Sequence, residues 1–328
     1  MIDKFFPQYA ICFILTFTLT VLIEKALIPA LSREAKQPIY EGGPSWHKSK
    51  SGTPTLGGLA FLLAIIVSLS CFSFFLFAKD MKEEAISVLL CMGFGALNSS
   101  VGIFDDLVKL RKKRNAGLKP YQKLALQFCI ATAFLSLGRY LLFDDTKISL
   151  SFGEIELGLF YYPICIIILL GITNCANLTD GIDGLAGSVS LATGVSLFYI
   201  SCALSPAASF VSAAIIGAAV GFLIFNVHPA KIFMGDTGSL LFGALASSVV
   251  FALDNPLLII PTGAIYVIEG VSVILQVLYY KMTKKRLFKM APLHHHLEKC
   301  GWSENKICLT AIILTLVVSI PAYVFYLP

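Results

Sequence analysis

Residues 56–78, LGGLAFLLAIIVSLSCFSFFLFA, carry no charged side chain. An apolar helix of this length can cross the hydrocarbon core of a bilayer, which takes about 20 residues. The rest of the chain has the same character, since 57% of its 328 residues are hydrophobic and 14% are charged. Soluble domains have roughly 25% charged residues. With a mean hydropathy of +0.81 the chain has more apolar surface than one core could bury, which predicts an integral membrane protein.

Ten apolar stretches are long enough to be transmembrane helices. They lie near residues 9–29, 56–78, 85–104, 121–143, 159–175, 185–204, 207–226, 237–253, 257–280 and 306–326. The sequence contains no internal repeat and no separate soluble segment, so we expect one all-α membrane domain over residues 1–328. Residues 144–158 alternate apolar and polar side chains around Gly153, which predicts a small β-hairpin outside the membrane.

The distribution of Lys and Arg predicts the orientation. Loops after odd-numbered spans contain nineteen of these residues, and loops after even-numbered spans contain four. The positive-inside rule therefore places the odd loops in the cytoplasm and, with ten spans, both termini and the hairpin outside. A net charge of +5 could suggest a nucleic-acid partner, but these cytoplasmic loops account for it, and we expect no such partner.

Five groups of polar residues stand in the cytoplasmic loops. In the first, Lys50 could reach an anion at the start of the second span, although an ordinary helix start with interfacial lysines is the alternative. The second group ends the third span with Asp105 and Asp106. Adjacent carboxylates at a helix C-terminus are unfavourable unless a cation such as magnesium offsets them. Lys109 could pair with either one on a continuing helix, so a plain ion-paired helix end is the alternative.

The third group contains Asn177, Asp180 and Asp183 but no Lys or Arg. Because the three are spaced three residues apart, one turn of helix could aim their side chains the same way. A turn rich in Asn and Asp is the alternative. An EF-hand is excluded because no acidic residue stands at the twelfth position.

The fourth group precedes the eighth span, and the fifth lies between the ninth span and the tenth. Asp236 stands between glycines at a helix start, where backbone N–H groups and a carboxylate can converge. Phe233 could stack on a planar base, or could be an interfacial anchor. Residues 294–296 are three consecutive histidines, which point in different directions on any regular backbone and cannot all bind one ion. Phosphate binding and proton transfer fit them as well as zinc binding does.

In this order and with these helices between them, the five groups resemble the polyprenyl-phosphate N-acetylhexosamine-1-phosphate transferases. The matching residues are GTPTLGG at 52–58, Asp105-Asp106 with Lys109, NLTDGIDG at 177–184, FMGDTGS at 233–239 and APLHHHLE at 291–298. Within that superfamily the triple histidine is typical of the phospho-N-acetylmuramoyl-pentapeptide transferases, so the chain resembles that subtype. One departure is Leu56, where methionine is frequent, and it should change packing rather than chemistry.

The resemblance implies a reaction at the cytoplasmic face of the bacterial cell membrane. UDP-N-acetylmuramoyl-pentapeptide would give its phospho-sugar to undecaprenyl phosphate, forming UMP and lipid I for peptidoglycan synthesis. It also implies a magnesium ion bound by Asp236 together with the catalytic carboxylates Asp105 and Asp106. Membrane lipids are the other expected contacts. The oligomeric state is left undecided between a monomer and a homodimer.

The resemblance also assigns the remaining site residues. Lys109, His294, His295 and His296 join the three carboxylates in the catalytic set. The substrate-binding set is Lys50, Thr55, Asn177, Asp180, Asp183, Asn226, Phe233 and Gln276. Four of these, Asn177, Asp180, Asp183 and Phe233, would surround the uridine.

The resemblance leaves two mechanisms open, and three other protein classes are alternatives. Asp105 could deprotonate the lipid phosphate for direct attack, or Asp106 could be a nucleophile. Direct attack is favoured because a dianionic phosphate is a competent nucleophile once a metal screens the repulsion. A transporter or channel would need several ionisable residues near the bilayer midplane, where only Glu269 lies. An intramembrane metalloprotease would need an HExxH motif, which the sequence lacks. A structural protein would account for the ten helices but not for the polar groups in the loops.

Overall fold

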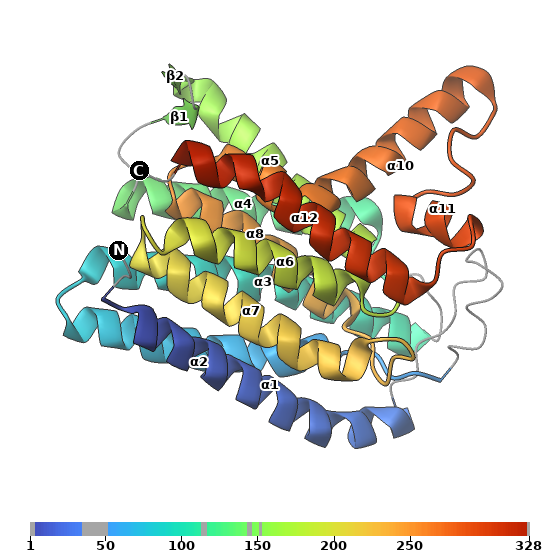
Figure 1. Cartoon of the computed structure of the whole chain (residues 1–328), viewed down its shortest axis with the longest axis horizontal. Helices are drawn as coiled ribbons and strands as arrows, with labels where there is room; N and C mark the ends of the chain where they lie inside the picture. The colour runs from blue at the N-terminus through green and yellow to red at the C-terminus, as the bar shows by residue number, and fades with distance from the viewer. Residues whose placement is uncertain (1–3, 35–51, 113–116, 143–145, 151–152, 327–328) are drawn as a thin grey trace.

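The computed structural model describes residues 4–34, 52–112, 117–142, 146–150 and 153–326, and within them the chain folds into a bundle of helices with one two-stranded hairpin (Figure 1). The long helices are α1 (Phe6–Glu34), α2 (Gly58–Ala78), α3 (Lys82–Lys112), α4 (Pro120–Leu141), α5 (Tyr161–Thr179), α6 (Leu185–Ser201), α7 (Pro206–Asn226), α8 (Gly235–Ala252), α10 (Ala264–Thr283) and α12 (Glu304–Tyr326). Shorter elements are η2 (Gly158–Phe160), η3 (Pro256–Leu258), α9 (Ile259–Thr262) and α11 (Leu293–Lys299). The prediction of an all-helical membrane protein is confirmed, since nine helices in the described ranges are long and apolar enough to cross a membrane.

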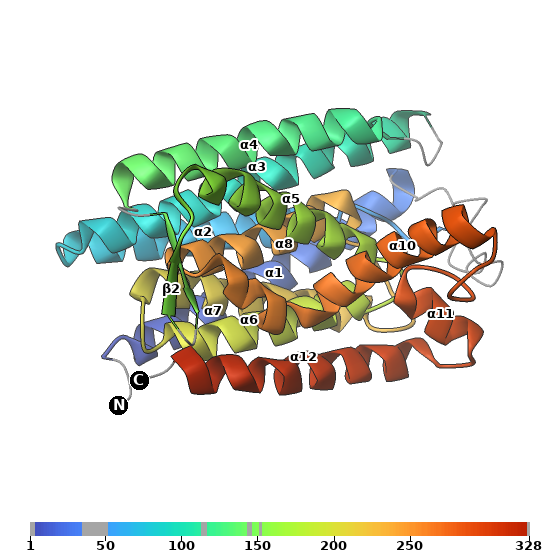
Figure 2. The same cartoon turned by 90° about the horizontal axis from the view of Figure 1, so that it is seen from above.

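Helix α6 is the one predicted span that falls short of that length, with 17 residues. Figure 1 shows that α1 begins and α12 finishes at the same end of the bundle. The predicted hairpin is confirmed at this end, where β1 (Lys147–Leu150) pairs antiparallel with β2 (Gly153–Glu156). At the opposite end α10 leans away from the bundle, and α11 lies beneath it (Figures 1 and 2).

Two predicted spans differ from the structure. The third span was expected to end at residue 104, but α3 continues to Lys112. Asp105 and Asp106 therefore lie inside a helix rather than at its C-terminus, and Lys109 pairs with both of them one turn further on, which favours the helix. The ninth span, predicted as one helix over 257–280, is broken into η3, α9 and α10. Pro261 lacks an N–H and Gly263 directly precedes α10, which together disfavour a continuous helix there.

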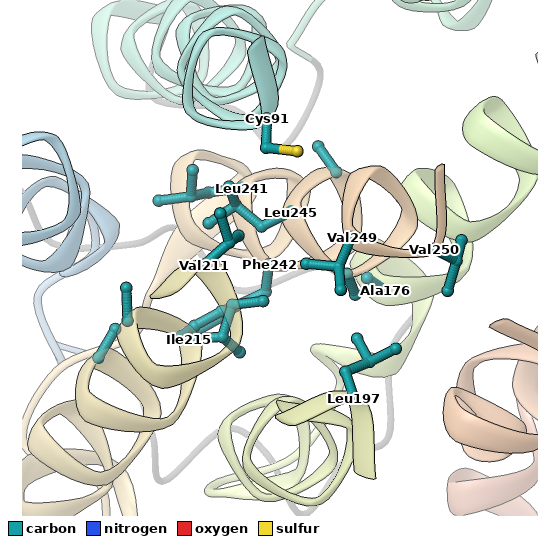
Figure 3. Close-up of a cluster of buried hydrophobic side chains, with 14 of the residues drawn as sticks. Cys91, Ala176, Leu197, Val211, Ile215, Leu241, Phe242, Leu245, Val249 and Val250 are labelled. Carbon is teal, nitrogen blue, oxygen red and sulfur yellow. The ribbon is translucent and has the colours of Figure 1, made fainter. Parts of the chain in front are cut away.

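Helix α8 forms the centre of the molecule. Buried residues make up 83% of its apolar window, more than in any other span of the described chain. Figure 3 shows its Leu241, Leu245 and Val249 among side chains from surrounding helices, including Cys91 of α3 and Ala176 of α5. This packing fixes the start of α8, at Gly235, against the C-terminal half of α3.

Candidate active site

Three carboxylates from two helices meet where α3 passes the start of α8. Asp105 and Asp106 belong to α3 and Asp236 belongs to the first turn of α8, and their nearest ligand atoms all lie within 4.8 Å of one another. Asp105 and Asp106 are buried, and Asp236 is largely so. The second and fourth polar groups of the sequence therefore form one acidic cluster.

Asp106 holds the start of α8 in place. Its Oδ1 accepts the backbone N–H of Asp236 (3.1 Å), and its Oδ2 accepts the N–H and the hydroxyl of Thr237 (3.0 and 2.8 Å). The first N–H groups of a helix have no partner within it, and a carboxylate satisfies them well. Gly102 makes this approach possible, since a Cβ there would lie 2.4 Å from the carbonyl carbon of Asp236.

Two lysines offset the charge of the cluster. Lys109 Nζ lies 2.6 Å from Asp105 and 3.1 Å from Asp236, and 3.8 Å from Asp106. Lys123, in the first turn of α4, lies 2.7 Å from Asp236 Oδ2 and donates to Asn177 Oδ1 (3.2 Å). Three carboxylates against two ammonium groups leave a net negative charge, which suits a cation.

Lys123 was missed in the sequence, where it counted only as a loop charge. The signal that could have found it is its position inside the apolar stretch 121–143, at the same membrane side as the acidic residues. A lysine inside a span is costly without a partner.

The third polar group splits in two. Asn177 donates to Asp236 Oδ1 (3.0 Å) and to the hydroxyl of Ser239 (2.8 Å), so it belongs to the cluster. Asp180 follows directly after α5, and burial together with the charges of Asp236 and Asp106 raises the pKa of its carboxyl to about 8.

Asp183 points elsewhere. Its Oδ2 accepts the N–H of Ala230 (3.0 Å) and lies 3.0 Å from His228 Nδ1, and its own N–H donates to Glu304 (2.7 Å). The prediction that one helical turn aims Asn177, Asp180 and Asp183 the same way is wrong. Helix α5 ends at Thr179, and the chain turns before α6 begins.

Hydrogen bonds around Thr55, Phe233 and Asn226 connect the segments that precede α2, α6 and α8. The N–H of Phe233 donates to the carbonyl of Pro54, and its own carbonyl accepts the N–H of Gly57, both at 2.9 Å. Thr55 adjoins Gly235, whose positive φ of 68° allows the tight turn before Asp236. The amide of Asn226 is used within the fold, because it accepts from Gly184 N–H and donates to the carbonyl of Ile232. Lys50 lies outside the described residues.

The three histidines of α11 make three different sets of contacts, as the sequence predicted. His294 is fully buried beside Glu269 of α10, at 3.2 Å between Nδ1 and Oε2. His295 Nδ1 lies 2.6 Å from Glu298, and His296 accepts the N–H of Lys289. Gln276 accepts the N–H of Phe288 (2.8 Å) and so ties α10 to the segment before α11.

The acidic cluster fits magnesium. All of its nearby ligand atoms are carboxylate oxygens, the hard donors that magnesium prefers. The other group of this kind in the described chain, formed by Asp183, His228 and Glu304, includes an imidazole and is less suited to it.

Comparison with known proteins identifies the family. Residues 88–254 match the model of glycosyl transferase family 4. A phospho-N-acetylmuramoyl-pentapeptide-transferase of Halalkalibacterium halodurans is 43% identical over 90% of this chain and 91% of its own length. The chain belongs to this transferase family. Enzymes of the same name from Clostridium perfringens strain 13 and Caldicellulosiruptor bescii are 41% and 39% identical, over 97% and 92% of this chain and the same shares of their own lengths.

Family membership agrees with the geometry. The family model covers residues 88–254, from within α3 to just past the end of α8, and this range contains the three carboxylates, Lys109 and Lys123. The resemblance that the five motifs predicted is confirmed. The chain is a multi-pass membrane transferase.

Proposed function

We propose that the protein transfers phospho-N-acetylmuramoyl-pentapeptide from its UDP-linked donor to undecaprenyl phosphate, forming lipid I and UMP. The observation that carries this proposal is the cluster of Asp105, Asp106 and Asp236 with Lys109 and Lys123, which combines metal-binding oxygens and phosphate-binding cations in one place. Two polyanionic substrates can meet only where positive charge screens their repulsion. The family membership supports the same substrates.

In this proposal Asp236, Asp105 and Asp106 hold a magnesium ion. When bound, the ion would neutralise the charge that develops on the diphosphate. Lys109 and Lys123, which pair with these carboxylates, would be the cations available to the phosphate oxygens of the substrates. Asn177 orients Asp236 through the hydrogen bond described above.

The contacts of Asp106 favour direct attack over a covalent intermediate. Both of its oxygens already accept hydrogen bonds from the start of α8. A carboxylate engaged in this way is a poor nucleophile, and its movement would release α8. In the direct route an oxygen of the lipid phosphate attacks the phosphorus next to the sugar, the bond to UMP breaks, and Asp105 takes any proton from the lipid phosphate.

The nucleotide is proposed to lie over the loops on either side of α6 and α7. Asp180 and Phe233 stand beside the cluster, and Phe233 is only half-buried, which leaves its ring open to a base. Thr55 adjoins the same turn. The histidines of α11 are proposed to bind the diphosphate of the donor as hydrogen-bond donors.

We further propose that the chain is one membrane domain with ten crossings and that the site faces the cytoplasm. Because α1 begins where α12 finishes, the number of crossings has to be even, and counting α6 makes it ten. The acidic cluster adjoins the loops rich in Lys and Arg, which the positive-inside rule assigns to the cytoplasm.

A transfer assay with radiolabelled donor tests the proposal. Purified protein in detergent, with magnesium and undecaprenyl phosphate, should form labelled lipid from UDP-MurNAc-pentapeptide and not from UDP-GlcNAc. Equal use of both donors would assign the chain to a different substrate, and no transfer from either would refute the function.

A further inference from the structure

Glu269 is a carboxylate that α10 carries into the buried part of the bundle. Its side chain is 6% exposed, and it belongs to none of the five sequence motifs. A carboxylate within a transmembrane helix is unfavourable unless it has a partner. Its partner here is His294, the first histidine of α11.

Glu269 holds both the backbone and the ring of His294. The N–H of His294 donates to Oε1 (3.2 Å) and lies 3.4 Å from Oε2. Oε2 is also 3.2 Å from Nδ1 of the ring. The two atoms are close enough for an ion pair, but their geometry is not that of a hydrogen bond. Catalytic hydrogen bonds are often poorly aligned before substrate binds.

The far side of the ring faces the turn after α5. His294 Nε2 is buried and has no hydrogen-bond partner in the described chain. A Cβ at Gly181 would lie 2.1 Å from Nε2, so only glycine lets the ring come this close. The preceding residue, Asp180, is near enough to Asp236 and Asp106 to interact with their charges. Nε2 therefore ends beside the loop that borders the acidic cluster.

We propose that Glu269 is a positioning residue for the transfer reaction, which keeps a proton on His294 Nδ1 and directs Nε2 toward the Asp180–Gly181 turn. A carboxylate beside one imidazole nitrogen fixes the proton there and leaves the other nitrogen to exchange a proton or meet a substrate oxygen. The inference rests on the proposed function, in which His294 serves the diphosphate. Glu269 itself contacts no substrate.

Three substitutions separate this role from a purely structural one. In Glu269→Gln the amide oxygen can still accept the N–H of His294, but the amide NH2 would face Nδ1 and force the ring proton onto Nε2. In Glu269→Ala both contacts are lost. In Glu269→Asp the charge is kept on a shorter side chain.

If Glu269 orients the ring, the Gln variant should be nearly as slow as the Ala variant. We expect kcat to fall at least about 100-fold in both, since reversing a histidine tautomer costs about that much or more. KM for the donor should stay within about threefold, because the substrate-binding residues are untouched. The Asp variant should recover part of the lost rate.

Glu84→Gln is the matched control. Glu84 of α3 also accepts a backbone N–H at a helix start, that of Ala207 (2.7 Å), but at the other end of the bundle. It should leave kcat unchanged, and the melting temperatures of all variants in detergent would report on folding.

A Gln variant with nearly wild-type kcat beside a slow Ala variant would refute the inference and leave Glu269 a structural anchor. A rise in KM that accounts for the whole loss would also refute it. Failure of the wild-type protein to transfer any phospho-sugar would instead refute the proposed function, and the inference with it.

Discussion

At the scale of single residues, the neighbouring carboxylates of α3 have different partners. Asp106 is bonded to the start of α8, while Asp105 accepts the N–H of Leu118 (2.7 Å) and pairs with Lys109. The sequence could predict that both belong to the site, because adjacent acidic residues beside a membrane helix need a cation. It could not predict their separate roles, since the N–H groups that Asp106 binds lie 130 and 131 residues away in the chain.

The first prediction concerns Lys123. Lys123→Gln removes the ammonium group closest to Asp236 and should lower kcat/KM at least tenfold, a change of about 1.4 kcal/mol, in the proposed transfer assay. Lys119→Gln is the control, because Lys119 is exposed four residues earlier and has no ion pair with the cluster in the described structure. Equal effects of the two substitutions would mean that only the overall charge of this loop matters.

Asp180 gives a prediction on pH. Its folded pKa of about 8 exceeds the ordinary value of 3.8, so the folded protein binds this proton more tightly than the unfolded chain does. The contribution to stability is therefore present at low pH and is lost as pH rises toward 8. Asp180→Asn cannot ionise, so its melting temperature relative to wild type should be higher at pH 8.5 than at pH 6, in detergent with a chelator. The same difference at both pH values would contradict the assignment.

At the scale of helices, the joint between α3 and α8 depends on one close approach. Gly102→Ala would add a Cβ 2.4 Å from the backbone of Asp236, so we expect the melting temperature to fall by several degrees and the transfer activity to be lost. Gly93→Ala is the control on the same helix, since a Cβ there meets nothing within 4 Å. Alanine in a helix interior is favoured over glycine by about 1 kcal/mol, so this variant should be as stable as wild type or slightly more so. A tolerated Gly102→Ala would show that the two helices can separate without harm.

Hydropathy predicted where the long helices lie but not every boundary. It identifies segments that tolerate lipid, and α11 lies in a basic loop where no such signal exists. The charged end of α3 was missed for the same reason. The break before α10 could have been predicted, because Pro261 and Gly263 stand in the stretch that was expected to be one helix.

At the scale of the whole molecule, charge distribution predicts which end faces the cytoplasm. Cysteine at Lys285, an exposed residue after α10, should react with an impermeant maleimide only after cells are opened. Cysteine at Glu154, exposed on β2, should react in intact cells. The exposed native Cys300 would first be replaced by serine. Labelling of position 285 in intact cells would reverse the proposed orientation.

The gathering of the five motifs at one end could be predicted in part. Each adjoins a loop on the same side of the membrane, so a shared face follows from topology alone. Which motifs touch depends on helix packing, and this is why Asn177 reaches the acidic cluster while Asp183 turns to His228. No periodicity in the sequence distinguishes the two.

The extension of α3 past the acidic cluster sets the depth of the chemistry. Lys112, the last residue of α3, lies six positions after Asp106, which at 1.5 Å per residue is about 9 Å along the axis. The carboxylates are thus set back from the end of the helix rather than exposed at its tip. A polyprenyl phosphate could then react without its hydrocarbon tail leaving the bilayer. The water-soluble nucleotide is the partner that has to travel inward and lose hydration, so tight binding of the donor has to overcome that dehydration before any bond is made.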